Sequence, residues 1–249
     1  MDTGTAQIRV LSSRVLIMKI LTLNIQQGGG SRAPGIVDWL NEAKSDIVIL
    51  TEFRPGATGA IFTSGLRKQG LSHFRYTDAA RGRNSVLLAS RFPITQRSIP
   101  TDTDDSHRLV AVEVERISLI GVYFAQKNQK ISLFDTLTQK TRELIVQDSL
   151  IMGDFNTGKS GEDGGTKPFY AEEKFSQLLD LGWVDAWRSR NPEAVEHSWF
   201  STQGNGFRID HALASPSLNK RITEAIYDHS VREARLSDHS ALSIRIEAE

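Results

Sequence analysis

The stretch Ser149–Gly158, SLIMGDFNTG, is apolar for the length of a strand and then places Asp154 and Asn156 two residues apart. Asp and Asn are ordinary turn residues because their side chains hydrogen-bond to the nearby main chain, so a simple turn is one interpretation. A functional site is the other, and it requires that further strands end in matching polar side chains. The sequence on either side of this stretch therefore has to supply them.

The length and composition of the chain limit what such a site is built on. At 249 residues with 39% hydrophobic content, the chain can bury a large core as one domain. The 30 basic and 30 acidic residues cancel, so no global field draws the protein to nucleic acid or to a membrane, although a local basic face is compatible with this balance. Cysteine is absent, which excludes disulfides, thiolate metal sites and cysteine nucleophiles.

The N-terminal segment imitates a signal peptide only faintly. Arg9 and Arg14 precede an apolar run over 15–23, but Lys19 interrupts the run and no small-residue cleavage site follows. The run is also shorter than the roughly 20 apolar residues of a membrane-spanning helix. We therefore expect no membrane segment, a cytoplasmic protein, and a poorly ordered N-terminal extension over 1–17.

Strand-like and helix-like patterns alternate along the rest of the chain. Apolar runs, many rich in Val and Ile, predict strands at 18–25, 47–50, 85–89, 109–114, 118–124, 149–152, 208–214 and 241–246. Amphipathic patterns at 36–43 and 175–179 predict helices that cover the sheets from outside. Clusters of Gly, Ser, Thr and Asn predict loops or turns at 56–65, 157–166 and 201–206. The two halves share this layout, which favours two packed sheets flanked by helices.

Polar side chains stand at the ends of many of these strands: Asn24, Glu52, Asp154, Asn156, Asp210, Asp238 and His239. Singly, each has an ordinary explanation as a cap, a turn residue, a solvated strand end or a buried imidazole, and Asp210 as an ion-pair partner of Arg208. Residues at the same ends of different strands converge in space, however, and function concentrates there. The whole set therefore predicts one site.

The residue types in this set define its chemistry. Carboxylates and amides with one histidine and no cysteine suit Mg²⁺ or Mn²⁺ and suit structural zinc poorly. Mg²⁺ is usually held by one or two carboxylates together with water and substrate phosphate, which matches Glu52 with Asn24 or Asp238. An Asp beside a His fixes the ring tautomer and stabilises the imidazolium. Hydrolysis of phosphate esters is the predicted reaction.

Six segments carry a family resemblance when they are taken in order: LTLNIQ (21–26), DIVILTE (46–52), VYFAQ (122–126), GDFNT (153–157), FRIDHALAS (207–215) and SDHSAL (237–242). This ordered set resembles the endonuclease/exonuclease/phosphatase superfamily from about Met18 to the C-terminus. The resemblance implies an α/β (α+β) fold, a four-layer sandwich of two facing mixed β-sheets flanked by helices. It also implies a single catalytic domain over 18–249 and Mg²⁺-dependent phosphodiester cleavage.

Tyr123 narrows this resemblance to one branch. Deoxyribonuclease I and the sphingomyelinases typically carry a histidine in the corresponding strand motif. Exonuclease III and the apurinic/apyrimidinic endonucleases carry Tyr, an apolar residue, Pro, and Asn or Gln. In this chain Ala125 replaces the Pro and Gln126 supplies the amide that faces substrate in that branch. The chain is therefore most similar to the exonuclease III and apurinic/apyrimidinic endonuclease branch.

Three hydrophobic residues extend the resemblance to the substrate. Trp199, Phe207 and Ile209 align with positions that line a pocket for the flipped baseless sugar in abasic-site endonucleases. Extruding a baseless nucleotide costs less than flipping a paired base, so such a pocket selects abasic sites. Ordinary core packing of these side chains is the alternative.

The resemblance also implies a role for each polar residue. Glu52 and Asn24, with Asp238, hold the metal, and Tyr123 donates to the phosphate or to the leaving group. Asp154, oriented by Asn156, activates water. His239, held by Asp210, is a donor to the phosphate or the alternative base, and sequence alone does not choose between the two bases because geometry comes before pKa.

The expected partner is DNA, as an abasic or otherwise damaged duplex or a 3′ end, bound by a monomer through backbone contacts from Arg81, Arg83, Lys127 and Lys130. The short loop 201–206, the Gly-rich loop 158–165 and the neutral net charge point to modest duplex affinity. Thr51 stands where Gln often precedes the metal-binding Glu, so the hydrogen bonding around that Glu departs from the family pattern. The alternatives are a general endonuclease, a phosphodiesterase or phosphatase of lipid or small-molecule phosphates, and a non-catalytic binding module.

Overall fold

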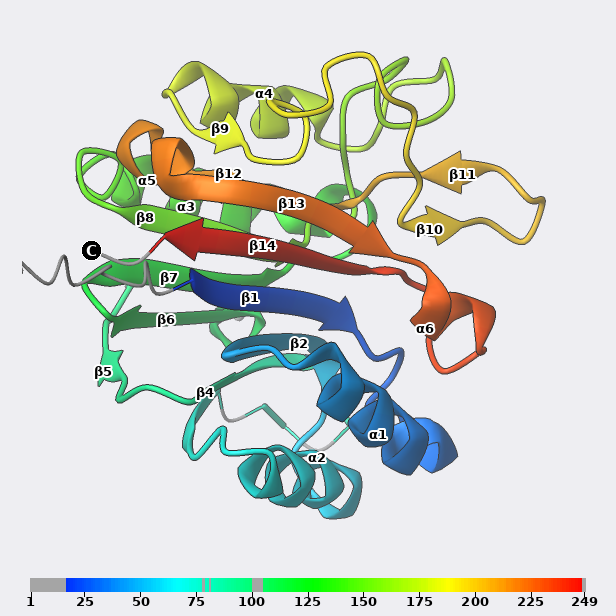
Figure 1. Cartoon of the computed structure of the whole chain (residues 1–249). Helices are drawn as coiled ribbons and strands as arrows, with labels where there is room; N and C mark the ends of the chain where they lie inside the picture. Colours follow the sequence, from blue (N-terminus) through cyan, green and yellow to red (C-terminus); the bar gives the residue numbers. More distant parts are fainter. Residues whose placement is uncertain (1–16, 78, 81, 100–104, 248–249) are drawn as a thin grey trace, which may run out of the picture.

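Two six-stranded sheets face each other in the computed structural model, which describes residues 17–77, 79–80, 82–99 and 105–247 (Figure 1). The first sheet has the order β13 (Ile222–Asp228), β14 (Ala241–Glu247), β1 (Ile17–Asn24), β2 (Ile47–Phe53), β4 (Ser85–Ser90), β3 (His73–Tyr76). The second has the order β5 (Thr95–Gln96), β6 (Leu109–Val114), β7 (Ile117–Tyr123), β8 (Ser149–Asp154), β12 (Asp210–Ala214), β9 (Val184–Asp185). The pairs β1–β2 and β7–β8 are parallel and the other pairs are antiparallel, so both sheets are mixed.

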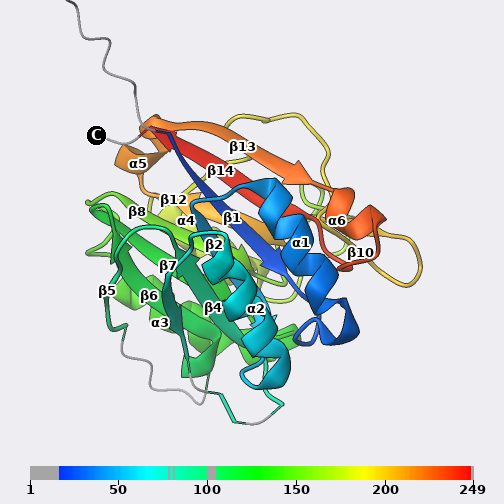
Figure 2. The same ribbon diagram turned by 60° about the horizontal axis from the view of Figure 1, so that its bottom comes forward.

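Helices cover the outer face of each sheet and complete four layers (Figure 2). The first sheet is covered by α1 (Ala33–Ala43) and α2 (Ala57–Lys68), and the second by α3 (Ile131–Lys140) and α4 (Glu172–Asp180). Ile36 of α1 packs with Leu23 and Leu50 in one outer core, and Phe134 of α3 packs with Ile151 in the other. A third core fills the space between the sheets. The expected four-layer α/β sandwich is confirmed.

Short elements connect these layers. The helices α5 (Pro216–Arg221) and α6 (Ser230–Glu233) lie between strands in the C-terminal part, and a two-stranded ribbon is formed by β10 (Trp199–Phe200) and β11 (Gly206–Phe207). The expected N-terminal extension lies outside the described residues except for Ile17, which begins β1. Within the part of the chain that the structure describes, no helix is long and apolar enough to cross a membrane.

The segment 56–65 is helical, and the expectation of a loop there is wrong. It forms most of α2, in which Phe62 and Leu66 are fully buried. Its glycines allow close helix packing: a Cβ on Gly65 would lie 2.3 Å from the Val37 side chain of α1. Glycine, serine and threonine are common both in turns and at close helix contacts, so the composition of 56–65 does not distinguish the two.

The strand pairing brings the predicted site residues to one end of both sheets. Asn24 ends β1 opposite Thr51, the residue before Glu52. Tyr123 ends β7 opposite Asp154 at the end of the parallel strand β8. Asp210 begins the antiparallel strand β12 opposite the same Asp154. Register alone therefore places these polar side chains in neighbouring rows.

A buried ionic network lies directly behind β12. Arg208 is fully buried, and its guanidinium lies 2.6 Å from Asp163 Oδ1 and 2.8 Å from Asp185 Oδ2. Burial alone would raise the pKa of the Asp185 carboxyl. The nearby charge of Arg208 nevertheless holds that pKa well below its usual range. Arg208 thus pairs with Asp163 and Asp185 and not with Asp210, the partner that the ordinary explanation of Asp210 assumed. Asp210 pairs with His239 instead.

We predict that Arg208→Met lowers the free energy of unfolding by about 3 kcal/mol, because it removes the nearest counter-charge of two buried carboxylates. Asp163 keeps Arg188 at 3.2 Å, which limits the loss. Arg245→Met is the matched control, since Arg245 pairs with Glu224 with both side chains more than 40% exposed, and it should cost at most about 1 kcal/mol. Urea unfolding followed by circular dichroism measures both variants. Similar small losses in the two would contradict a stabilising role for the network.

Candidate active site

The Asn24 amide joins the two sheets at the centre of the site. Its Nδ2 donates to Asp154 Oδ2 at 2.9 Å and to Glu52 Oε1 at 3.3 Å. Its Oδ1 accepts from the main-chain N–H of Gln26 at 2.8 Å. The amide nitrogen therefore faces both carboxylates, and a residue of the first sheet holds a carboxylate of the second.

Asp154 and Asn156, at the end of the stretch 149–158, form both a turn and part of the site. The main-chain N–H of Asn156 donates to Asp154 Oδ1 at 2.8 Å, which is an Asx turn. The Asn156 side chain also donates to Asp154 Oδ2 at 3.1 Å and to the Phe124 carbonyl at 2.9 Å. Local turn bonding thus fixes the orientation of the Asp154 carboxylate toward the cluster.

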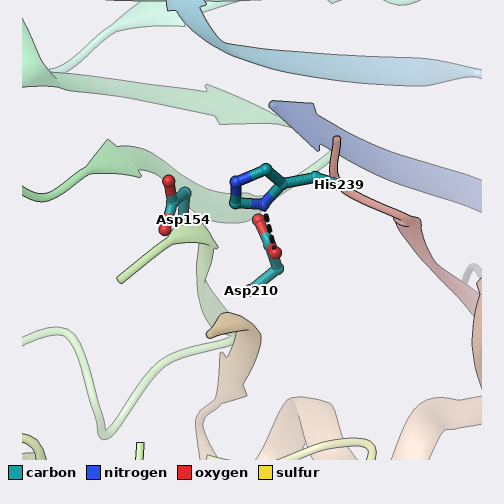
Figure 3. A group of neighbouring side chains, drawn as sticks. All are labelled: Asp154, Asp210 and His239. Atoms are coloured by element: carbon teal, nitrogen blue, oxygen red, sulfur yellow. Dashed lines mark hydrogen bonds and ion pairs between the residues drawn. The ribbon is translucent and has the colours of Figure 1, made fainter. Parts of the chain in front are cut away.

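Asp154, Asp210 and His239 form a compact buried group (Figure 3). His239 Nδ1 lies 2.8 Å from Asp210 Oδ2, and one donor atom from each of the three residues lies within 4.8 Å of the others. Burial alone would lower the pKa of the His239 imidazole, but the Asp210 carboxylate raises it to about 10. Burial and the Asp210 charge raise the pKa of Asp154 above its usual range. The Asp210 charge therefore favours the imidazolium form of the ring.

Tyr123 faces the opposite side of the cluster. Its hydroxyl donates to Glu52 Oε1 at 3.2 Å and accepts from Asn84 Nδ2 at 3.3 Å. Arg54 Nε donates to Asn84 Oδ1 at 2.6 Å, and the Arg108 guanidinium lies 5.0 Å from the centre of the tyrosine ring. Burial and the Glu52 charge raise the pKa of Tyr123 well above its usual range, so the phenol stays neutral and is a donor.

Asn84 was missed in the sequence, although a signal was present. It lies immediately before β4, and Ser85 at the start of that strand pairs with Phe53 at the end of β2. In an antiparallel pair, the first residue of one strand lies beside the last residue of its neighbour. A polar residue just before an antiparallel strand, such as Asn84, therefore reaches the same edge as the polar residues that end the other strands.

The oxygen atoms of this site fit a hard divalent cation. Asp210 Oδ1 and Asp238 Oδ1 are buried and have no hydrogen-bond partner among the described residues, and an unpaired buried carboxylate oxygen is costly. Of the three predicted ligands, Asn24 and Glu52 are in contact, whereas Asp238 Oδ2 accepts from Trp199 Nε1 at 3.2 Å. Oxygen ligands of this kind suit Mg²⁺ or Mn²⁺.

Of the three predicted pocket residues, Trp199 packs against His239 and Phe207 packs against Trp199. The Trp199 ring centre lies 6.0 Å from that of Phe207 and 6.4 Å from that of His239, while Ile209 is buried. Phe169, which no sequence pattern singled out, packs edge-on against Phe207 at 5.7 Å. The β10–β11 ribbon and the segment around Phe169 thus form an aromatic wall next to the catalytic histidine candidate.

The expected basic contacts have mixed outcomes. The expectation that Lys130 contacts a phosphate is wrong: its side chain is buried, donates to the Asn156 carbonyl, and has its pKa lowered by burial to about 8. Gln126, Lys127 and Arg83 are exposed, and Arg83 lines a cavity of about 370 Å³ that also contacts Asn84. Arg81 lies outside the described residues. A lysine in a basic surface pattern can still be buried, because a single main-chain acceptor suffices to hold it.

Two solved structures are similar to this chain in fold, and one curated protein is similar to it in sequence. The 3′ phosphatase NExo from Neisseria, bound to a product DNA hairpin, is 25% identical with a TM-score of 0.80, covering 92% of this chain and 99% of that one. An AP endonuclease from Archaeoglobus fulgidus is 24% identical with a TM-score of 0.79, covering 91% and 98%. Recombination repair protein 1 of Drosophila melanogaster is 28% identical over 168 residues, 57% of this chain and 24% of that protein. This chain spans about a quarter of that relative's length.

A family model gives the broadest match. The model described as the Endonuclease/Exonuclease/phosphatase family matches residues 21–239, from the first of the six sequence motifs to His239 in the last. The resemblance inferred from those motifs is thereby confirmed, and the structural neighbours fall on its AP endonuclease and exonuclease side. The chain belongs to the endonuclease/exonuclease/phosphatase family.

Proposed function

We propose that this protein is a metal-dependent phosphodiesterase that cleaves DNA, a repair nuclease of the exonuclease III and AP endonuclease type. The observation that carries this conclusion is the buried group of Asp154, Asp210 and His239, joined to Glu52 through the Asn24 amide. Family membership supports phosphodiester hydrolysis. A neighbour bound to a DNA hairpin supports DNA as the partner, and a monomer in the cytoplasm stays a prediction.

Asp154 is the proposed base that activates water. Burial and the Asp210 charge raise its pKa, so the ionised carboxylate accepts a proton more readily than a solvated aspartate does. Asn156 holds both of its oxygens in place. The water oxygen attacks phosphorus as its proton passes to Asp154, and the bond from phosphorus to the 3′-oxygen breaks.

His239 serves as a donor to the phosphate in this proposal. Because Asp210 keeps the ring protonated at neutral pH, His239 has no free lone pair with which to act as a base. Its Nδ1 is bound to Asp210, which leaves Nε2 to donate to a phosphate oxygen. Tyr123 donates from the other side as a neutral phenol. We therefore propose Asp154 as the base, a choice that the sequence left open between Asp154 and His239.

Glu52 and Asp238 are the proposed metal ligands, and Asn24, whose amide contacts Glu52, is the third residue that would hold the ion. A bound Mg²⁺ or Mn²⁺ supplies the positive charge that polarises the phosphate and stabilises the leaving 3′-oxygen. The orphaned Asp238 Oδ1 and the excess of carboxylates over cations in the site support this assignment.

The aromatic wall supports a nucleotide substrate. Trp199 lies beside His239 with Phe207 packed against it, and an unpaired or baseless nucleotide next to the cleaved phosphate would contact these two rings. The Trp199 and Phe207 pair, with Tyr123 in place of His, also argues against a phosphodiesterase or phosphatase of lipid or small-molecule phosphates. A general endonuclease without abasic preference is the second candidate, and the comparison of substrates below separates the two.

The first test of this function compares substrates in the presence of Mg²⁺. We expect cleavage of an abasic duplex or of a labelled 3′ end, loss of activity in EDTA, and recovery with Mg²⁺ or Mn²⁺. Asp154→Asn should lose on the order of a thousandfold in turnover, because it removes the proposed base, with an unchanged circular dichroism spectrum. Full turnover in EDTA contradicts the metal site, and cleavage confined to a small nitrophenyl phosphodiester contradicts the DNA substrate.

A second prediction concerns the charge of His239 in metal-free protein. NMR titration of the imidazole nitrogens should show a protonated ring through pH 8, and Asp210→Asn should lower the pKa, because it removes the largest cause that opposes burial and leaves only Asp154 and Asp238 to raise it. Since the folded pKa lies above the unfolded one, the stability from this pair is complete below about pH 6.5 and is lost as pH rises through about 10. Asp135→Asn, at an exposed carboxylate that binds Lys174, is the control. A ring that titrates normally in the wild type rules out the imidazolium.

A third prediction concerns the aromatic wall. Trp199→Ala and Phe207→Ala should reduce abasic-site cleavage more than digestion of a normal 3′ end, because only the former needs the pocket. Phe200→Ala is the matched control, since Phe200 lies on the same ribbon and contacts His197 and Arg232 instead. Trp199→Phe keeps the ring but removes the N–H that Asp238 accepts, which separates the two roles of Trp199. Equal losses on both substrates argue for a general endonuclease.

A further inference from the structure

The connection between β1 and α1 has an unusual backbone. Residues 26–30, with the sequence QQGGG, all have positive φ values, from 52° to 76°. Glycine adopts this left-handed region freely, but Gln26 and Gln27 do so only under restraint. Contacts from outside the loop must therefore hold it in this form.

This loop orients two of the proposed metal ligands. The main-chain N–H of Gln27 donates to Glu52 Oε2 at 2.6 Å, and that of Gly28 donates to the Glu52 carbonyl at 2.9 Å. Gln26 N–H binds Asn24 Oδ1. Glu52 itself has a positive φ of 56°. The positions of the Glu52 carboxylate and the Asn24 amide thus depend on the conformation of the loop.

Arg32 joins this loop to a second segment of the chain. It ends the short 3₁₀-helix Gly30–Arg32, and its Nη2 donates to the carbonyls of Gln26 at 2.8 Å and Ile25 at 3.3 Å. Its Nη1 donates to the Leu236 carbonyl at 2.5 Å. Leu236 precedes Asp238 by two residues and His239 by three, so one guanidinium spans the two halves of the site.

Two further contacts hold the same halves together. Ser237 Oγ donates to the Asn24 carbonyl at 2.5 Å and accepts from the His239 main-chain N–H at 3.1 Å. A Cβ on Gly35 of α1 would lie 2.8 Å from Leu236 Cδ2, so the segment before Asp238 packs directly on the helix that follows Arg32. The spacing between the halves is therefore built into the fold, and Arg32 is its charged element.

We propose that Arg32 is a positioning residue that sets the spacing between Glu52 with Asn24 and Asp238 with His239, and thereby the affinity of the site for a divalent cation. This inference rests on the proposed function. A guanidinium suits the task because its donors lie in one plane at fixed angles, so two acceptors bound to it keep a fixed separation. Lysine, with a single flexible ammonium, holds the acceptors less strictly.

An arginine near a nuclease site also invites a simpler role as a phosphate ligand. Both terminal nitrogens of Arg32 already donate to main-chain carbonyls, and the side chain is half-buried. The two roles differ in what they change. A phosphate ligand alters the KM for DNA, whereas a positioning residue alters metal affinity in the absence of DNA.

The experiment measures Mn²⁺ binding to DNA-free protein by isothermal calorimetry or by electron paramagnetic resonance of free Mn²⁺. Arg32→Ala should weaken the Mn²⁺ Kd about 10–100-fold, the usual cost of removing a residue that supports metal ligands, and Arg32→Lys should lie between Arg32→Ala and the wild type. The control is Arg91→Ala, because Arg91 joins Asp46 at the opposite end of the strands. At saturating Mn²⁺ the kcat of Arg32→Ala should approach the wild-type value with the KM for DNA unchanged.

The outcomes separate this inference from the function on which it rests. A wild-type protein that binds no Mn²⁺ overturns both. Wild-type binding with an unaltered Kd in Arg32→Ala overturns the positioning role alone, as does a raised KM for DNA at a normal Mn²⁺ Kd. If circular dichroism shows that Arg32→Ala does not fold, the same Mn²⁺ measurement is made on Ser237→Ala. This variant removes the hydrogen bond from Ser237 to the Asn24 carbonyl, which also joins the two halves. Weaker Mn²⁺ binding in that variant supports the inference, and unchanged binding overturns it.

Discussion

The ion pair between Asp210 and His239 is the interaction on which the site depends. Both side chains are buried, so each charge is tolerated only because the other lies 2.8 Å away. The main chain around Asp210 is held as well, because its N–H donates to Ser198 Oγ and its carbonyl accepts from Tyr227. With this pair in place, Asp154 faces a rigid imidazolium and a rigid carboxylate together. Burial first and the Asp210 charge second raise the pKa of Asp154, whereas the His239 charge lowers it.

The fold produces this arrangement because the two mixed sheets face each other and the strand ends that carry polar residues lie at the same edge of both sheets. A parallel pair in each sheet brings strand ends together, and the antiparallel strand β12 returns to the same edge to place Asp210 opposite Asp154. The Asn24 amide then joins the sheets at their polar edge, where the hydrophobic core between them ends. Behind β12, Arg208 with its two carboxylates holds the loop after β8. Core packing, register and buried charge thus position the same few atoms.

The parts of this structure that follow from sequence are those where one signal has one structural meaning. An apolar run that ends in Asp154 specifies a buried strand with a polar end, and the site lies there. Predictions were wrong where one pattern fits two structures. The glycines of α2 suggested a loop but mark a close helix contact. The charge of Lys130 suggested an exposed side chain, but the side chain is buried. The contact of Phe169 with Phe207 had no counterpart in linear spacing, and Asn84 stands at the start of a strand, where its contact with Tyr123 depends on how distant strands pair. Pairing between distant segments, which only the fold defines, accounts for these cases.

Trp199 shows how closely recognition and chemistry are joined in this fold. Its ring packs against Phe207 in the aromatic wall, its main chain forms a bridge with His239, and its indole N–H binds Asp238. Phe207 contacts Trp199 but, among the described residues, its ring packs against neither charged residue, so it belongs to the wall alone. Trp199 is therefore the residue through which the aromatic wall and the charged residues Asp238 and His239 are joined.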